Sequence, residues 1–297
     1  MLSSLPLLLS ASTAEISAIN NNNGTYPGDC PTSFPANQCR LSRTDFRSAS
    51  GLFAIITGIE HSGTTVMLQL IASAPNLYGA LECGLLLAPK RPSRFREVSP
   101  FYDWMILNRT AWWGLTREQR SLMTDKSKCF AEVYAKLRRY SPAFRHAPNT
   151  KSWVVDKTPA YVRRLVSVMD RTPGVPVVVT EKSERDQVRS LMKRGLAESK
   201  AKDRVADGKA GLRAALVKYP RRIHVVNTTM LYRDPSAVME RVFDFLGLRW
   251  KEEYLSMEVA TAKHRMGRPD LNASFKVTPF NPAALNSMNE TIRHVGS

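Results

Sequence analysis

The sequence predicts an α/β fold, a three-layer parallel sheet with helices on both faces and a P-loop-type phosphate-binding loop. Three observations favour it. Short Val- and Ile-rich runs alternate with helical patterns from Leu52 onward, as expected for parallel strands joined by crossover helices. These runs are almost continuously apolar, which is typical of strands covered on both faces. A glycine-bounded loop follows the first run directly. We expect strands at 53–57, 152–156, 175–180 and 222–227.

The helices between these strands have recognisable ends. Thr116 with Gln119 forms a capping-box pattern, which predicts that a helix begins at the following residues. Pro235 suits the first turn of a later helix, whose apolar residues recur on one face. Gly247 is expected to end that helix in the left-handed conformation.

The chain has 297 residues, enough for one large α/β domain. Residues 1–45 are rich in Ser, Asn, Pro and Gly, and we interpret them as an irregular tail or weak signal segment. Residues 46–297 are expected to form a single domain. A basic, aromatic-rich helical insertion at about 90–150 lies between the first two of the expected strands and is placed to cover a cleft.

The composition favours an anionic partner. Lys and Arg total 43 against 26 Asp and Glu, a net charge of +17. Nucleic acid, a phosphorylated cofactor, an acidic glycan or a membrane surface would each suit such a charge, and a basic surface kept for solubility is the simpler alternative. The basic residues are scattered and form no recognition motif, so we expect no nucleic-acid partner. No apolar run approaches the roughly 20 residues of a membrane span, so no transmembrane segment is expected.

The compartment is indicated by glycosylation sequons and cysteines. Five N-x-[ST] sequons, at Asn23, Asn108, Asn227, Asn272 and Asn289, favour a glycoprotein of the secretory pathway or Golgi lumen, with the cytoplasm as the alternative. The spacing of Cys30 and Cys39 suits a disulfide in an oxidising compartment and equally suits free thiols. The four cysteines and the histidines form no zinc pattern, and no metal ligands are predicted.

The segment "GIEHSGTT" is the clearest candidate site. Gly58 and Gly63 have the spacing of a phosphate loop, in which backbone N–H groups turn toward an anion. Ser62, Thr64 and Thr65 supply further donors, and the N-terminus of the following helix adds positive potential. A nucleoside-triphosphate hydrolase would have lysine where Thr64 stands, so ATP or GTP hydrolysis is disfavoured.

The pattern Ser-Gly-Thr-Thr after a strand resembles the 5′-phosphosulfate loop of sulfotransferases that use 3′-phosphoadenosine 5′-phosphosulfate (PAPS). Four more segments resemble that family in the same order, most closely in the style of carbohydrate and protein-tyrosine sulfotransferases. Together they cover most of residues 52–250. They read "NLYGALECGLLL", "WVVDKTPAYVRRL", "VPVVVTEKSERDQVRSLMKRG" and "IHVVNTTMLYRDPSAVMERVFDFLGLRW".

The resemblance implies transfer of a sulfuryl group from PAPS to an acceptor hydroxyl, which releases 3′,5′-ADP and needs no metal. It assigns Glu82 as the base, Lys157 as the contact to the transferred group, and His61 as a candidate near the leaving oxygen. The loop residues Gly58, Ser62, Gly63, Thr64 and Thr65 would bind the 5′-phosphosulfate. Lys182 and Ser190, eight positions apart, would bind the 3′-phosphate.

The chain departs from the family pattern at four places. One is the segment "NTTMLYRDP", where the acidic residue expected before the late helix is replaced. His61 stands where the family usually has Lys or Arg, and it is charged only part of the time near neutral pH. Lys182 stands where Arg is usual, so a point charge replaces a bidentate fork. The basic glycine-containing loop that closes on the 3′-phosphate in cytosolic members is not recognisable, although residues 263–270 are a candidate.

Two other hypotheses about the function stay open. A non-catalytic module of the same fold that binds a nucleotide or an anionic glycan is favoured by His61 and Lys182. A P-loop kinase is favoured by Asp156, which sits where a metal-holding aspartate is expected, and disfavoured by the missing lysine. The acceptor of the predicted enzyme is a hydroxyl on a glycan, a tyrosyl residue or a small alcohol, and an anionic glycan or acidic peptide would suit the charge. The sequence does not predict an oligomeric state.

Overall fold

The computed structural model describes residues 43–80, 82–98, 101–104, 113, 115–141, 144 and 152–255. Several sequence-based expectations concern residues outside these ranges. They are the tail up to residue 42 with Cys30 and Cys39, the sequons other than Asn227, and the candidate loop at 263–270.

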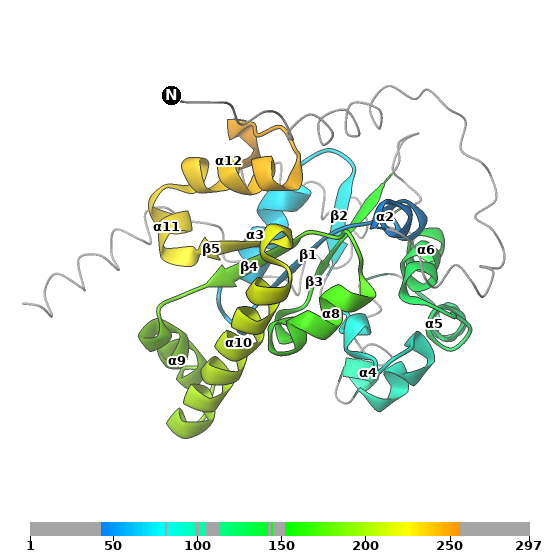
Figure 1. Cartoon of the computed structure of the whole chain (residues 1–297), viewed down its shortest axis with the longest axis horizontal. Helices are drawn as coiled ribbons and strands as arrows, with labels where there is room; N and C mark the ends of the chain where they lie inside the picture. Colours follow the sequence, from blue (N-terminus) through cyan, green and yellow to red (C-terminus); the bar gives the residue numbers. More distant parts are fainter. Residues whose placement is uncertain are drawn as a thin grey trace, which may run out of the picture.

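A five-stranded, fully parallel sheet forms the centre of the molecule (Figure 1). The strand order is β2-β3-β1-β4-β5. The strands are β1 Leu52–Gly58, β2 Leu77–Ala80, β3 Trp153–Lys157, β4 Val177–Glu181 and β5 Ile223–Asn227.

Helices cover both faces of the sheet, which confirms the predicted three-layer α/β fold (Figure 1). The α-helices are α2 Arg43–Ser50, α3 Thr64–Ala72, α4 Phe101–Trp104, α5 Arg117–Thr124, α6 Phe130–Tyr140, α8 Leu165–Arg171, α9 Glu184–Met192, α10 Glu198–Lys218, α11 Thr228–Arg233 and α12 Pro235–Leu246. Short 3₁₀ helices are η2 Leu85–Leu87, η3 Pro92–Glu97, η6 Pro159–Arg164, η7 Pro220–Arg222 and η8 Glu252–Leu255.

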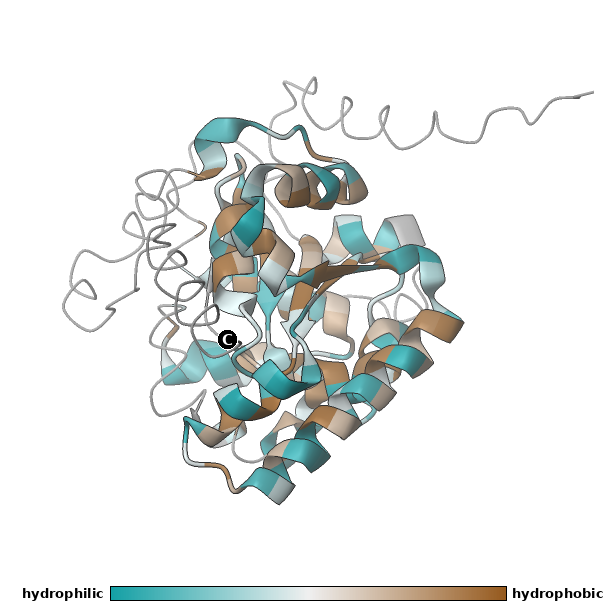
Figure 2. Cartoon of the chain, turned by 90° about the vertical axis from the view of Figure 1, so that its left-hand side faces the viewer, coloured by the Kyte–Doolittle hydropathy of each residue, from teal (hydrophilic) through white to brown (hydrophobic). Residues whose placement is uncertain are grey.

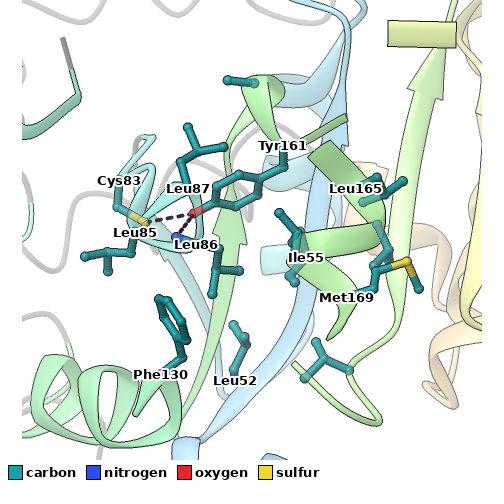
Figure 3. Close-up of a cluster of buried hydrophobic side chains, with 14 of the residues drawn as sticks. Leu52, Ile55, Cys83, Leu85, Leu86, Leu87, Phe130, Tyr161, Leu165 and Met169 are labelled. Carbon is teal, nitrogen blue, oxygen red and sulfur yellow. Dashed lines mark hydrogen bonds between the residues drawn. The ribbon is translucent and has the colours of Figure 1, made fainter. Parts of the chain in front are cut away.

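Two apolar cores lie on opposite faces of the sheet. One packs Leu52 and Ile55 against side chains of α2, α6, α8 and α10. The other packs Phe53 and Ile56 against α3 and α12. Figure 2 shows hydrophobic residues in the central strands, whereas the surrounding helices mix hydrophobic and hydrophilic residues. Figure 3 shows part of the first core, where Tyr161 reaches toward the chain at η2.

Four strands occur where the sequence predicts them, with ends that differ by at most two residues. The capping box of Thr116 and Gln119 is formed, and α12 begins at Pro235 and ends before a left-handed Gly247. The edge strand β2 was not predicted. It has only four residues and includes Gly and Ala, which have low strand propensity, so it lacks the Val/Ile signal of the others.

The aromatic residues predicted in the helical insertion contribute to the core where the structure describes them. Trp113 is buried, and Phe101 and Tyr102 pack against the same core. Within the described residues, no helix has the length and apolar character that crossing a bilayer would require.

Candidate active site

Every predicted site residue lies in or directly after the carboxyl end of a strand, or on the helix that follows. The register places Ile56 beside Lys157 and Gly58 beside Thr180, so the ends of β1, β3 and β4 are level. The connection after β1 runs toward β2, whereas the connection after β4 runs the other way to β5. Between β1 and β4 this arrangement creates a topological switch point, where α/β sheets form ligand crevices.

The loop after β1 is built on unusual backbone conformations. Gly63 has φ 96° and His61 has φ 68°, both in the left-handed region. A Cβ at Gly58 would lie 2.4 Å from Thr180 O and 2.6 Å from Ser62 Oγ, and a Cβ at Gly63 would lie 2.9 Å from Thr228 Cγ2. Both positions therefore need glycine. His61 adopts the left-handed conformation although it is not a glycine, and backbone strain of this kind is often found at functional sites.

Side chains from three neighbouring elements fix the loop. Ser62 Oγ hydrogen-bonds Thr180 Oγ1 of β4 at 2.7 Å. Thr228 Oγ1, at the start of α11, donates to Ser62 O at 2.6 Å, and Gln187 Nε2 of α9 donates to Glu60 O at 2.6 Å. Because these three bonds reach the loop from different directions, its shape is set before any ligand arrives.

The acidic side chain of the loop is neutralised from outside. Arg163 donates to Glu60 Oε1 at 2.7 Å, and Arg204 of α10 lies 3.8 Å from the same oxygen. A carboxylate so close to a phosphate-type loop would repel an anion, and the two guanidinium groups offset that repulsion.

The start of α3 presents donors toward the loop. Its first helical hydrogen bond runs from Met67 N–H to Gly63 O, so the earliest N–H groups of the helix have no intrahelical acceptor. Thr64 is buried and Thr65 is exposed. Ser62 differs from them because its N–H donates to Ile59 O and its hydroxyl is bonded to Thr180, so both groups shape the loop.

A second candidate anion site lies beside β4. Lys182 Nζ is 3.5 Å from Ser190 Oγ, and Ser190 in turn donates to Asp186 O at 2.7 Å. Partial burial lowers the pKa of Lys182, and the nearby Asp186 opposes that shift. Lys182 forms no salt bridge with any described residue. A half-buried ammonium without an ion pair, held next to a hydroxyl, is suited to bind a phosphate.

Lys157 and Glu82 form an ion pair on the other side of the loop. Lys157 ends β3 with a side chain only 1% exposed, and its Nζ lies 3.1 Å from Glu82 Oε1. Glu82 follows β2 and its side chain is 25% exposed, so it remains partly accessible to solvent. Lys157 is therefore a buried cation paired with Glu82 and not a solvated charge at the end of the strand.

His61 lies between the two sides. Partial burial lowers the pKa of His61, and the cation Arg194 lowers it further. Glu60 and Glu82 raise the pKa, and Lys182 lowers it. The charges that shift the pKa of His61 belong to both sides of the site, Lys182 to one and Glu82 to the other. His61 therefore favours the neutral form at neutral pH.

Several residues that shape this site were not identified from the sequence. They are Thr180, Thr228, Gln187, Arg163 and Arg204, which fix the loop or neutralise its acid. The pattern Asn-Thr-Thr at the end of the last strand is the signal that marks Thr228. The others carry no local signal, because they reach the loop from elements distant in sequence.

Asp156 is not placed to hold a metal ion. Its carboxylate is 1% exposed and accepts hydrogen bonds from Tyr134, Tyr161, Cys83 and Thr158. Those four donors occupy the acceptor positions that a metal ion would need. No group of three or more metal-ligating side chains occurs in the part of the chain that the structure describes.

The sulfotransferase family model matches residues 54–252, which include the loop and both charged sites. The chain belongs to the sulfotransferase family. A search of curated proteins gave no match.

Solved structures show the same fold. The sulfotransferase domain of the Synechococcus PCC 7002 olefin synthase is 21% identical, with a TM-score of 0.57 over 78% of this chain and 84% of that one. The sulfotransferase domain from the curacin biosynthetic pathway is 17% identical, with a TM-score of 0.51 over 71% of this chain and 82% of that one.

Proposed function

We propose that this sulfotransferase transfers the sulfuryl group of PAPS to an acceptor hydroxyl and releases 3′,5′-ADP. The observation that carries the proposal is the presence of two separate candidate anion sites. The loop 58–65 is one, and the pair of Lys182 and Ser190 is the other. A donor phosphorylated at both the 5′ and 3′ positions needs two such sites, whereas ATP has its phosphates in one chain.

The loop and the start of α3 bind the 5′-phosphosulfate in this proposal. The N–H groups at Gly63, Thr64 and Thr65 supply neutral donors at a helix N-terminus, where the helix dipole favours negative charge. Lys182 and Ser190 bind the 3′-phosphate through a cation and a hydroxyl. Gly58 and Ser62 keep the loop in the conformation that exposes those donors.

Chemistry takes place on the side of Lys157 and Glu82. The acceptor oxygen attacks sulfur, the bond from sulfur to the bridging phosphate oxygen breaks, and the electron pair leaves with 3′,5′-ADP. Lys157 stabilises negative charge on the sulfuryl oxygens, a contribution of about 10²–10³ in rate for one well-placed donor. Glu82 takes the proton of the acceptor hydroxyl, worth about 10²–10⁴ in rate.

His61 is assigned to the leaving oxygen. With its pKa lowered in the free protein, it donates a hydrogen bond as a neutral imidazole, and a bound dianion would favour its protonated form. This differs from the fixed positive charge that the family usually places there.

The acceptor is a hydroxyl on a glycan, a tyrosyl side chain or a small alcohol. A net charge of +17 favours an anionic glycan or acidic peptide among these. The insertion at about 90–150 follows the strand that precedes Glu82, and we assign acceptor specificity to it.

The compartment in this proposal is the secretory pathway, with the cytoplasm as the alternative. The sequons support it, although the Asn227 side chain already accepts hydrogen bonds from Thr229 N and Met230 N as the cap of α11. Enzymatic removal of N-glycans from protein produced in eukaryotic cells should increase its electrophoretic mobility. An unchanged mobility would favour the cytoplasm.

Calorimetric titration tests the nucleotide assignment. Wild type is expected to bind 3′,5′-ADP more tightly than ATP–Mg²⁺ or 5′-ADP. Ser190→Ala and Lys182→Ala should each weaken 3′,5′-ADP about 10- to 100-fold, because each removes a hydrogen bond to a charged phosphate. Neither change should affect binding of 5′-ADP, which lacks the 3′-phosphate.

Ser199→Ala and Lys200→Ala serve as matched controls, since both residues are exposed and lie on α10, outside the β4–α9 unit that carries Lys182 and Ser190. They should leave the titration unchanged. A preference for ATP–Mg²⁺ would favour the kinase, and nucleotide binding without turnover of labelled PAPS over an acceptor panel would favour the non-catalytic module.

A further inference from the structure

A buried polar cluster includes the chain neighbours of both residues of the Lys157–Glu82 ion pair and takes no part in the proposed chemistry. It consists of Cys83, Tyr134, Asp156, Thr158 and Tyr161, each at most 1% exposed. Asp156 Oδ2 accepts from Tyr134 OH, from Tyr161 OH at 2.9 Å and from Cys83 Sγ at 3.3 Å. Thr158 Oγ1 donates to Asp156 Oδ1 at 3.1 Å. We refer to these five residues as the Asp156 cluster.

The donors of the cluster stay protonated. Burial raises the pKa of Cys83, Tyr134 and Tyr161 well above their usual values. Burial also raises the pKa of Asp156, and the hydrogen bonds from Tyr134 and its other partners oppose that shift. Four hydrogen bonds pointing into one carboxyl group match the acceptor capacity of a carboxylate.

Three members of the cluster also hold the segment that carries Glu82. Gly84 N–H donates to Thr158 Oγ1 at 3.3 Å, and Leu86 N–H donates to Tyr161 OH at 3.2 Å. Cys83, the neighbour of Glu82, bonds Asp156 itself and lies 3.7 Å from Tyr161 OH (Figure 3). Residues 82–87 thus have no β-ladder of their own but are tied to the end of β3 by the cluster.

Asp156 does not contact the reacting groups. It precedes Lys157 in β3, and consecutive strand residues point to opposite faces of the sheet. Any effect it has on chemistry must therefore pass through the segment 82–87.

The geometry points to Asp156 as a positioning residue, which sets Glu82 against Lys157 by fixing residues 82–87 through Cys83, Thr158 and Tyr161. This inference rests on the proposed function for its catalytic meaning. A base must lie within hydrogen-bond reach of the proton it removes, and displacements near 1 Å can cost about 10²-fold in rate. Without the hydrogen bonds from the cluster, the Glu82 carboxylate would not be kept within about 1 Å of one position.

Tyr161→Phe and Tyr134→Phe form a matched pair for the test. Each removes one hydroxyl from Asp156, but only Tyr161 also accepts the Leu86 N–H, and Tyr134 lies on α6. Hydrogen–deuterium exchange of residues 82–87 should be faster in Tyr161→Phe and in Asp156→Asn, and unchanged in Tyr134→Phe. Exchange in α12 should be the same in all of them.

Kinetics separate positioning from general destabilisation. Tyr161→Phe should lower kcat about tenfold or more and leave the affinity for 3′,5′-ADP unchanged, because Lys182 and the loop are untouched. In a Glu82→Gln background, Tyr161→Phe should have no further effect on kcat, because its effect passes through the Glu82 carboxylate.

Two results would overturn the inference. One is unchanged exchange at 82–87 in both Tyr161→Phe and Asp156→Asn. The other is an equal loss of kcat from Tyr161→Phe with and without Glu82→Gln. If wild type does not turn over PAPS, the proposed function fails, and the exchange experiment alone still decides whether the cluster fixes this segment.

Discussion

The two sides of the candidate site hold charge in opposite ways. On the β1–β4 side, Lys182 is half-buried without a salt bridge to any described residue, and the loop offers neutral N–H groups. On the β2–β3 side, Lys157 is almost fully buried and already paired with Glu82. Unpaired donors suit binding of an anion, whereas a paired cation and base suit chemistry. Substitutions on the β1–β4 side should therefore change the affinity for the nucleotide, whereas substitutions on the β2–β3 side should change kcat.

The largest effect is expected for Lys157→Met. Removing the ammonium breaks the ion pair with Glu82 and takes away the proposed donor for the sulfuryl oxygens, so kcat should fall about 10²–10³-fold. Affinity for 3′,5′-ADP should change by less than about threefold, because the phosphate sites lie on the other side. Steady-state turnover of labelled PAPS and calorimetry measure the two quantities.

Lys136→Met provides the control. Lys136 forms an ion pair with Glu132 at 2.8 Å on α6, away from the strand ends, and its removal should change neither quantity. A loss of nucleotide affinity in Lys157→Met with kcat retained would contradict the division of the site.

The same division explains how much of the site could be predicted from sequence. The loop could be located because its proposed role depends on the backbone, and Gly58 and Gly63 mark the conformations that it adopts. Lys182 and Ser190 could be paired because their spacing resembles that of the family's 3′-phosphate strand–loop–helix unit, and the structure places both on β4, α9 and the loop between them. The fold could also be predicted from local sequence, since each buried parallel strand has a strong apolar signal within one short segment.

Contacts between distant segments could not be predicted in this way. Lys157 and Glu82 are 75 positions apart, and the Ser62–Thr180 contact spans 118. Such pairs depend on the strand order, which periodicity does not reveal. Asp156 is the sharpest example. Its position in the sequence suggested a metal-holding aspartate, and only the packing of Tyr134 and Tyr161 shows it to be a buried acceptor.

An intermediate effect is expected from Gly63→Ala compared with Gly195→Ala. The two glycines have nearly equal φ values, 96° and 90°, so each alanine costs about 1–2 kcal/mol of backbone strain. At Gly63 the new Cβ also meets Thr228 Cγ2 at 2.9 Å, whereas nothing lies within 4 Å at Gly195. Overpacking should add about 1–3 kcal/mol at Gly63 only.

Urea unfolding measures this difference, and titration with 3′,5′-ADP adds a second readout. Gly63→Ala should also weaken nucleotide binding, because the shift of Thr228 disturbs the loop, while Gly195→Ala should bind normally. Equal stability losses would show that the loop tolerates a side chain at Gly63.

The smallest effect concerns the pH dependence of stability through His61. Its pKa in the folded protein is below the usual value of 6.5, so protonation favours the unfolded chain. As far as His61 affects it, the free energy of unfolding of wild type is therefore highest above about pH 6.5. It decreases as the pH falls through that value toward the pKa of His61 in the folded protein. His61→Asn suits the left-handed φ of 68° and does not titrate, so its stability should fall less over the same window. His224 also has a lowered pKa, caused by burial and Arg241, but it is present in both proteins, and its effect cancels in the comparison.

Parallel pH profiles of unfolding free energy for wild type and His61→Asn would show that the pKa of His61 is not lowered in the folded protein. A difference that disappears with 3′,5′-ADP bound would place the imidazole beside the nucleotide, because a nearby dianion raises its pKa and removes the penalty.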